Sequence, residues 1–199
     1  MFSGIVEATS RVLSSKPLDR AVTVYVERPF EFQDLKIGDS IACNGICLTV
    51  EGFDEKQIQF TLGAETLCLL QLNPETLIGQ VWNLERSLKF GDRVHGHLVT
   101  GHVEALGHVM FSEALGDSWI LRVQVPSFLR RYLWAKGSVA LHGVSLTVNR
   151  FENDEIEVCL IPETLKRTNL RSLSVGSPVN LETDYLAKAY FQGRDHGLS

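Results

Sequence analysis

The sequence is short of several features that mark particular classes of protein. It has 199 residues but no apolar run long enough for a bilayer-spanning helix, and its first residues lack the basic leader and apolar stretch of a secretory signal. It has 19 Lys and Arg against 24 Asp and Glu, a formal net charge of -5, without a basic cluster. We therefore expect neither a nucleic-acid partner nor a membrane association, and we expect a cytoplasmic protein.

Cysteine is also scarce. Four cysteines in a chain of this length are too few for a dense disulfide framework. We expect Cys43, Cys47, Cys68 and Cys159 to be free thiols, as in a reducing compartment. The 44% hydrophobic content is enough for the core of one large domain or of two small ones.

The main positive feature is an internal repeat. A shift of 98 positions places residues 40–50 on 138–148, and 13 of the 33 residues between 40 and 72 are then identical. Average composition would give roughly two identities. After a one-residue slip, 4–8 matches 101–105 and 83–85 matches 180–182. We therefore predict two units, 1–93 and 97–186, followed by a C-terminal helix or tail over 187–199.

Each unit has the pattern of short strands separated by turns. Alternating residues predict strands at 21–27, 40–42, 46–50 and 58–62. The pair Asn44-Gly45 is a strong hairpin signal, and His142-Gly143 takes the same place in the second unit. Only 184–192 has a helical pattern. The sequence thus predicts an all-β protein of two small tandem barrels, an architecture that leaves no exposed sheet edges.

Four segments resemble the riboflavin synthase family, in that family's order along the chain. They are MFSGIV at 1–6, NGICLTV at 44–50, GHLVTGH at 96–102, and GVSLTV at 143–148 followed by IPETLKRT at 161–168. The family dismutates two molecules of 6,7-dimethyl-8-ribityllumazine, by transfer of four carbons, into riboflavin and 5-amino-6-(D-ribitylamino)uracil. A reaction between two copies of one substrate needs two similar pockets, which a duplicated unit supplies.

The resemblance implies a fold and an assembly as well as an activity. It implies two six-stranded Greek-key β-barrels, a C-terminal helix and a homotrimer. The N-terminal barrel of one subunit faces the C-terminal barrel of another at each active site, which holds two substrate molecules. No metal or other cofactor is implied, and a lumazine synthase is a candidate neighbour.

The resemblance also assigns roles where the two copies differ. His102 matches a family histidine of the active site, and a base near neutral pH suits removal of a proton from the 7-methyl group of the lumazine. The first copy has Ile5 at that place. Without the resemblance, His102 would be read as a surface histidine.

A second difference lies on matching strands. Cys47 aligns with Ser145, and each stands two residues before a threonine, Thr49 or Thr147, so strand alternation puts each pair on one face. Hydroxyl groups can bond the heterocycle, and a thiolate could add to it covalently. A small buried thiol is the plainer alternative for Cys47.

The complete set carried over from the family is larger. The catalytic candidates are His102, Cys47, Ser145, Thr147 and Asp184. The substrate contacts in the N-terminal unit and its matching segments are Gly4, Ile5, Val6, Ser40, Cys47, Leu48, Thr49, Thr61, Leu62, Gly63, Glu65 and Thr66. Those in the C-terminal unit are Gly101, His102, Val103, Lys136, Ser145, Leu146, Thr147, Leu160, Ile161, Pro162, Thr164 and Leu165. Solvated charges remain the alternative for Lys136 and Asp184.

Some positions depart from the family pattern, and two other functions stay open. Leu70 and Gln71 replace the Thr-Asn of the second unit, while His95 and His142 stand where Gly and Asp are usual. His97 could join His95 and His102 in a zinc site, although no fourth ligand is clearly placed. A non-catalytic lumazine or flavin carrier on the same fold is the other alternative.

Overall fold

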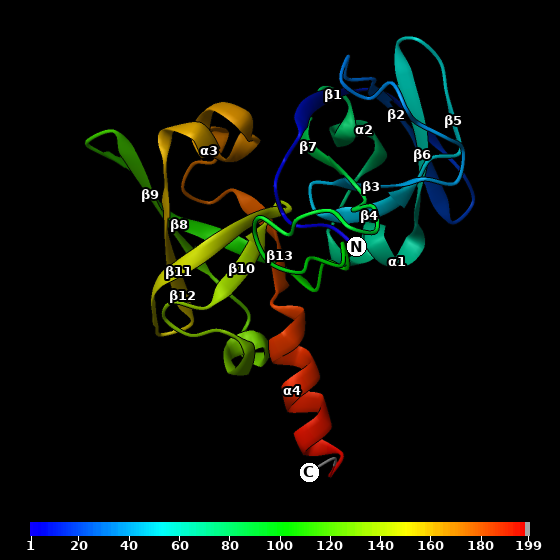
Figure 1. Ribbon diagram of the computed structural model, residues 1–199. Coiled ribbons are helices and arrows are strands. Elements are labelled where there is room, and N and C mark those ends of the chain that lie inside the picture. Colours follow the sequence, from blue (N-terminus) through cyan, green and yellow to red (C-terminus); the bar gives the residue numbers. More distant parts are fainter. Residues whose placement is uncertain (198–199) are drawn as a thin grey trace.

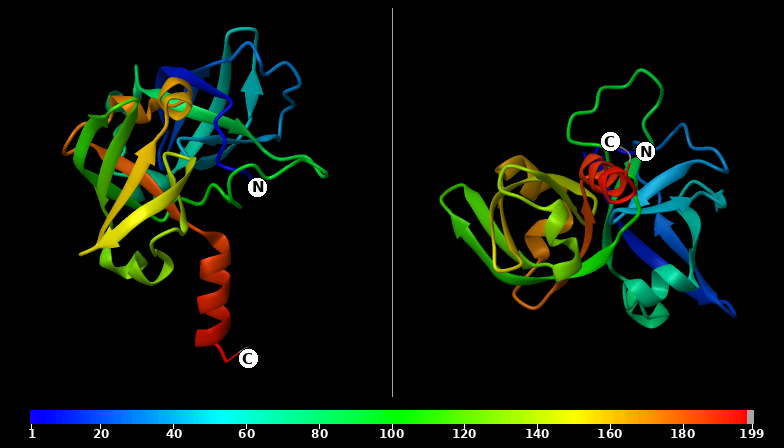
Figure 2. Two further views of the ribbon diagram at one scale, coloured as in Figure 1. Left: turned by 60° about the vertical axis from the view of Figure 1, so that its left-hand side comes forward. Right: turned by 90° about the horizontal axis from the view of Figure 1, so that it is seen from below.

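The computed structural model describes residues 1–197 and shows two β-structures side by side, with one helix projecting from them (Figures 1 and 2). The N-terminal half contains β1 (Ala8–Pro17), β2 (Ala21–Glu27), β3 (Ser40–Cys43), β4 (Ile46–Thr49), β5 (Gly52–Phe53), β6 (Gln57–Gly63), α1 (Ala64–Leu69), α2 (Pro74–Leu77) and β7 (Val81–Arg86). The C-terminal half contains β8 (Ala105–Leu115), β9 (Ser118–Gln124), a 3₁₀ turn (Ser127–Tyr132), β10 (Ser138–Leu141), β11 (Val144–Glu152), β12 (Glu155–Leu160), α3 (Pro162–Arg167), a second 3₁₀ turn (Asn169–Ser172), β13 (Pro178–Thr183) and α4 (Tyr185–Asp195). The last two residues of the predicted tail lie outside the described part of the chain.

Strand order confirms the duplication. The C-terminal strands close into a barrel in the order β10-β11-β12-β9-β8-β13, and the N-terminal sheet runs β4-β3-β7-β1-β2-β6-β5. These are the same circular order, because β4 and β5 correspond to the two halves of β11. The fold class is therefore as predicted, with two differences: the N-terminal sheet, called the N-terminal barrel below, has seven strands rather than six, and it is not closed by hydrogen bonds between its end strands β4 and β5.

The extra strand arises where the second copy has a β-bulge. The register between β11 and β12 shifts between Val148 and Arg150. In the first copy the chain breaks at the same point, and Gly52 begins β5 where Arg150 continues β11. Glycine weakens a strand interior. The irregularity that only bends β11 in the second copy therefore interrupts the strand in the first copy and divides it into β4 and β5.

Each barrel encloses its own apolar core. Along β4 the buried side chains are those of Ile46 and Leu48, while Cys47 is half-buried and Thr49 exposed. Strand β11 repeats this alternation. Period-2 patterning thus turns one face of β4 and of β11 inward, as the sequence predicted for residues 46–50. Within residues 1–197 no helix is long and apolar enough to span a bilayer.

The two barrels meet across an approximate two-fold axis at their hairpin turns. Gly45 and Gly143 have left-handed φ angles of +81° and +78°. A methyl group on Gly45 would lie 2.8 Å from the backbone nitrogen of Gly143, and one on Gly143 would lie 2.7 Å from that of Gly45. The hairpins therefore touch backbone to backbone, which requires glycine on both sides.

Side chains on each side of the axis bind the opposite hairpin. Asn83 Nδ2 donates to the carbonyl oxygen of His142 at 2.9 Å, and Asn180 Nδ2 donates to that of Asn44 at 2.8 Å. Asn44 Oδ1 accepts the Asn83 N–H at 2.8 Å, and His142 Nδ1 accepts the Asn180 N–H at 3.1 Å. The departure from the family pattern at His142 therefore preserves the junction.

Helix α4 is anchored on the C-terminal barrel. Asp184 Oδ1 caps the helix by accepting the Leu186 N–H at 2.9 Å, so the helix begins one residue later than predicted. Ala187 is buried, and Lys188 Nζ lies 3.1 Å from Glu104 Oε1. The helix is thus held at its first turns and projects beyond the barrel (Figure 1).

The glycine contact predicts a large effect of a small substitution. Gly45→Ala should lower the free energy of unfolding by about 3 kcal/mol, because a methyl group meets Gly143 and also disfavours the left-handed φ. Chemical denaturation of both proteins measures this. Gly79 is the matched control, since it has φ +86° but a methyl group there would meet no other described atom within 4 Å. Gly79→Ala should cost only about 1 kcal/mol, and an equal loss in both variants would contradict the role of the contact.

Candidate functional site

The segments that directly precede β1 and β8, residues 3–7 and 100–104, cross to the opposite barrel and are called the first and second crossing segments. The Ser145 N–H of β11 donates to the Gly4 carbonyl at 2.8 Å, and the Cys47 N–H of β4 donates to the Gly101 carbonyl at 2.8 Å. Val6 lies in the core of the C-terminal barrel, whereas Val103 packs against the core of the N-terminal barrel. Each barrel is therefore completed by a segment of the other copy.

The two glycines in these segments are required by strand contacts. Gly4 and Gly101 have φ angles of +74° and +80°, and a methyl group on either would lie 2.6 Å from the Cβ atom of Ser145 or Cys47, respectively. The sequence analysis placed both glycines among the substrate contacts. In the structure the space is occupied by the strand that carries the candidate catalytic residue.

The candidates on β4 and β11 share one strand face in each copy, as expected, and that face points out of the barrel. Ser145 is half-buried and Thr147 exposed, matching Cys47 and Thr49. Ser40 is paired across the strands with Thr49, and Ser138 with Thr147. Each barrel thus presents a row of small polar side chains beside a crossing segment.

The remaining candidates divide by the direction of their side chains. Four leucines point into the barrel cores, so only their backbone faces the outer side: Leu48, Leu62, Leu146 and Leu160. Those at least partly exposed at the ends of β6 and β12 or in the following helices are Thr61, Gly63, Glu65, Thr66, Ile161, Pro162, Thr164 and Leu165. Ile5 and His102 lie exposed in the crossing segments.

His97 is a residue that sequence reasoning considered only as a metal ligand. Its Nδ1 atom lies 2.7 Å from Ser145 Oγ, whereas its Nε2 atom is buried without a hydrogen-bond partner in the described chain. Burial lowers the pKa of His97, against the opposing effect of the Asp184 and Glu182 carboxylates. The imidazole is therefore neutral at pH 7 and can accept a proton.

The sequence held a partial signal for this pair. His97 stands inside one of the family segments, five residues before His102, but only the fold brings it to a strand 48 residues away. Asp184, predicted as catalytic, caps α4 and acts electrostatically on His97. Residues 1–197 contain no cluster of three or more His, Cys, Asp or Glu side chains able to hold a metal ion.

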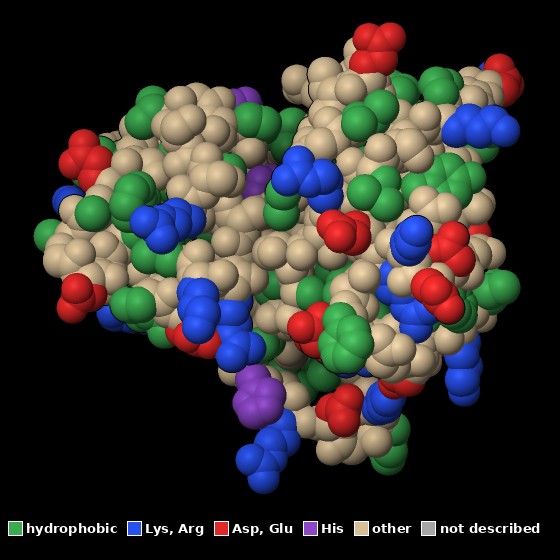
Figure 3. Space-filling model, turned by 90° about the horizontal axis from the view of Figure 1, so that it is seen from above, with side chains coloured by type: hydrophobic (Ala, Val, Ile, Leu, Met, Phe, Trp, Pro, Cys, Tyr) green, Lys and Arg blue, Asp and Glu red, His purple; other side chains and the backbone are tan. Residues whose placement is uncertain are grey.

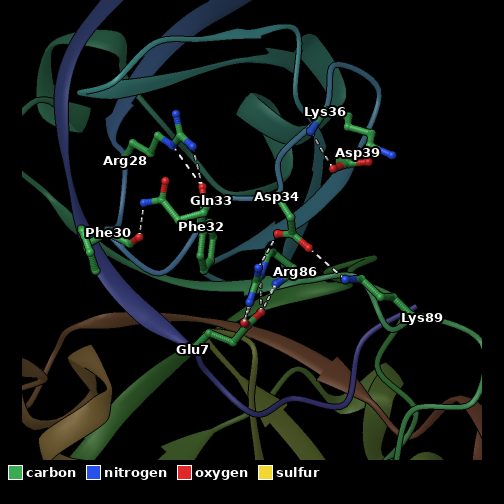
Figure 4. Close-up of polar contacts among 10 residues, drawn as sticks. All are labelled: Glu7, Arg28, Phe30, Phe32, Gln33, Asp34, Lys36, Asp39, Arg86 and Lys89. Atoms are coloured by element: carbon green, nitrogen blue, oxygen red, sulfur yellow. Dashed lines mark hydrogen bonds and ion pairs between the residues drawn. The ribbon is translucent and has the colours of Figure 1, made fainter.

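A cavity of about 390 Å³ adjoins Ile5 and is bordered by a network of charges (Figure 4). Arg86 bonds Glu7 and also lies 2.5 Å from Asp34, which Lys89 contacts at 2.8 Å. The Lys89 ammonium and the Arg86 guanidinium lower the pKa of Asp34 to about 2. This network ties the first crossing segment to the N-terminal barrel.

A second cavity, of about 530 Å³, lies in the C-terminal half. Its wall contains two predicted contacts, Pro162 and Leu165, together with Trp119, Lys166 and Arg171. On the face drawn in Figure 3, positive and negative side chains are intermixed.

Comparison with known proteins supports one family. The profile of the lumazine binding domain matches the chain twice, over residues 3–87 and 100–184. The chain is 39% identical to the riboflavin synthase of Photobacterium phosphoreum over 190 residues, which cover 94% of this chain and 86% of that protein. Over 192 residues it is 34% identical to the riboflavin synthase of Bacillus subtilis, covering 96% and 89% of the two chains.

Solved structures confirm the fold. Crystal structures of LumP complexed with 6,7-dimethyl-8-(1'-D-ribityl) lumazine and with riboflavin match with TM-scores of 0.81 and 0.82, at 22% and 23% identity. Each match covers 92% of this chain and 99% of that one.

Backbone strain at Lys136 yields a test of its predicted contact role. Lys136 has φ +71°, and its counterpart in the first copy is Gly38, at φ +94°. A left-handed φ costs less for glycine than for lysine, so the lysine at position 136 favours a function for its side chain. Lys136→Gly should raise the free energy of unfolding by about 1 kcal/mol but weaken binding of 6,7-dimethyl-8-ribityllumazine, measured by fluorescence titration.

The control for Lys136 is Gln71, an exposed residue with φ +51° outside the candidate set. Gln71→Gly should also raise stability but leave ligand affinity unchanged. Unchanged affinity in Lys136→Gly as well would remove this lysine from the site.

Proposed function

This chain belongs to the riboflavin synthase family, and from that premise we propose that it converts two molecules of 6,7-dimethyl-8-ribityllumazine into riboflavin and 5-amino-6-(D-ribitylamino)uracil. Four carbons pass from one molecule to the other. Because donor and acceptor are the same compound, no external oxidant or reductant is needed. The chain is therefore a transferase, with lumazine as its substrate.

The reciprocal crossing of the two copies is the observation that carries the proposal. It gives each barrel an outward row of polar groups beside a segment from the other copy, and the two sites differ in chemistry. One offers the thiol of Cys47. The other offers the Ser145 hydroxyl with His97 Nδ1 at 2.7 Å. Two identical substrates can thus be held in two unlike environments.

The His97–Ser145 pair provides a base for the first step. The neutral imidazole can take the proton of the lumazine 7-methyl group through the Ser145 hydroxyl, while Asp184 and Glu182 favour the imidazolium that results. Exposed His102, on the segment beside Cys47, is then available to the molecule at the N-terminal barrel. We propose that this difference between the two sites decides which substrate molecule donates the four carbons and which one accepts them.

The assembly is part of the proposal. Helix α4 exposes Tyr185, Leu186 and Tyr190, at 44%, 61% and 64%. Packing of these side chains in a homotrimer would bring the N-terminal barrel of one subunit to the C-terminal barrel of the next. Lumazine synthase is a proposed neighbour, and the four free thiols support a cytoplasmic location.

Sedimentation equilibrium tests the assembly. We expect a mass three times the 22.2 kDa of the chain. Leu186→Asp should dissociate the trimer, because it places a charge in the apolar contact. The charge-matched control is Val175→Asp, which places the same charge on an exposed apolar side chain (67%) outside α4. A monomeric wild-type protein would contradict the shared site.

The central experiment incubates purified protein with 6,7-dimethyl-8-ribityllumazine alone and follows the appearance of riboflavin absorbance. Tight fluorescent binding without product would instead support a carrier, the alternative favoured by the likeness to LumP. In the same assay, Ser145→Ala and His97→Ala should each lower kcat more than they change KM. The double variant should lose little more than either single one, because the two residues act as a unit. Additive losses would contradict a shared role.

A further inference from the structure

Two buried carboxylates hold the crossing segments in place. Glu85 accepts the Ser3 N–H at 2.7 Å, the Ser3 hydroxyl at 2.9 Å and the Gly4 N–H at 3.0 Å. In the second copy, Glu182 accepts the same three groups from Thr100 and Gly101, at 2.7, 2.6 and 3.0 Å. The side chains are only 4% and 2% exposed.

The turn held by Glu85 supports both members of the catalytic pair. The Ser145 N–H donates to the Gly4 carbonyl at 2.8 Å, and the His97 N–H donates to the Ser3 carbonyl at 3.2 Å. A methyl group on Gly96 would lie 2.2 Å from the Ser3 oxygen and 2.7 Å from Ser145 Oγ. Because these atoms are closely packed, a shift of the Ser3–Gly4 turn would displace both His97 and Ser145.

We propose that Glu85 is the positioning residue of the His97–Ser145 pair: its carboxylate fixes the Ser3–Gly4 turn, and through it the distance between the imidazole and the hydroxyl. The catalytic consequence rests on the proposed function. Glu182 does the corresponding work for the segment beside Cys47, which carries no such pair. Glu182 acts on His97 through its charge, whereas only Glu85 holds the turn that fixes the distance between the imidazole and the hydroxyl.

The charge of Glu85 costs stability, which argues for a functional role. Burial raises the pKa of Glu85 to about 7 despite its three hydrogen bonds. A carboxyl group whose folded pKa lies above its unfolded value makes the protein less stable as pH rises from about 4.5 to 7. The ionised form of Glu85 is therefore less favourable in the folded protein than in the unfolded chain, although it is the form whose two oxygens accept all three donors.

Ionisation of Glu85 also couples the turn to pH. The carboxylate accepts three donors, but protonation turns one oxygen into a donor, which cannot face an N–H group. The charged groups that face Glu85 are Glu7, which raises its pKa, and those of the adjoining cavity wall: Arg86, Lys89, Asp92, Arg93 and His95. Glu7 is itself paired with Arg86, so its effect is reduced.

The experiment compares pH profiles of kcat for wild type, Glu85→Gln and the matched control Glu182→Gln. Wild type should lose turnover below about pH 7, where Glu85 becomes protonated. Glu85→Gln should lower the plateau on the order of tenfold, because small displacements of catalytic groups are costly, with KM changed less. Its acid limb should move to the lower pH at which His97 titrates. Glu182→Gln should keep the limb near 7.

A second variant protects the test against misfolding. Ser3→Ala removes one hydrogen bond that lowers the pKa of Glu85, so the acid limb should move above 7, the opposite direction to Glu85→Gln. Thermal unfolding checks that each variant is folded. A limb unmoved in both Ser3→Ala and Glu85→Gln, or moved equally by Glu182→Gln, would overturn the proposal.

Histidine NMR separates this inference from the proposed function. In ligand-free protein with ¹³C-labelled histidine, the His97 signal, assigned with His97→Gln, should shift near pH 7 as Glu85 titrates. That step should vanish in Glu85→Gln and persist in Glu182→Gln. An inactive wild type with this step would reject the enzyme but keep the positioning role, whereas absence of the step would reject the latter.

Discussion

The backbone contact between the hairpins of Gly45 and Gly143 is the constraint on which the rest of the structure depends. It brings strands β4 and β11 side by side at the axis, close enough for each to bond the crossing segment of the other copy. A side chain at either glycine would separate the barrels and with them Ser145 from Gly4, and Cys47 from Gly101. The placement of Ser145 and Cys47 against the crossing segments is thus a property of the junction between the barrels.

The junction is symmetric in its backbone but not in its side chains. Asn169 N–H donates to Asn83 Oδ1 at 2.8 Å, and its Nδ2 donates to Asn44 Oδ1 at 2.9 Å, which completes one half. The corresponding residue of the first copy is Gln71, whose side chain makes no such bonds within residues 1–197. The cavity of about 330 Å³ beside the junction is lined from both halves, by Leu70 and His142 as well as by Asn44 and Asn169. The departure at position 71 therefore leaves the two halves with unequal hydrogen bonding.

Much of the fold could be predicted from the sequence, because its signals are local or repeated. The strand over Ala21–Glu27 follows from alternation, and the hairpin at Asn44–Gly45 from its turn residues. The repeat supplied the tandem arrangement. The exchange of segments was not visible, since nothing local in Ser3–Gly4 shows that it lies on the other barrel. For the same reason His97 was seen beside His95 and His102, its neighbours in sequence, and not beside Ser145.

The two buried glutamates show why duplication alone does not make the two sites equal. Glu85 and Glu182 make equivalent contacts to corresponding groups of the two copies, two backbone N–H groups and one hydroxyl, so each copy holds one crossing segment in the same way. The effect of each glutamate depends on which strand residue is hydrogen-bonded to the crossing segment that it holds. Beside Glu182 that is the backbone of Cys47, whereas beside Glu85 it is a serine already bonded to a buried imidazole. The cost of burying the Glu85 charge would then have a chemical use, because the proposed base takes its position from that carboxylate.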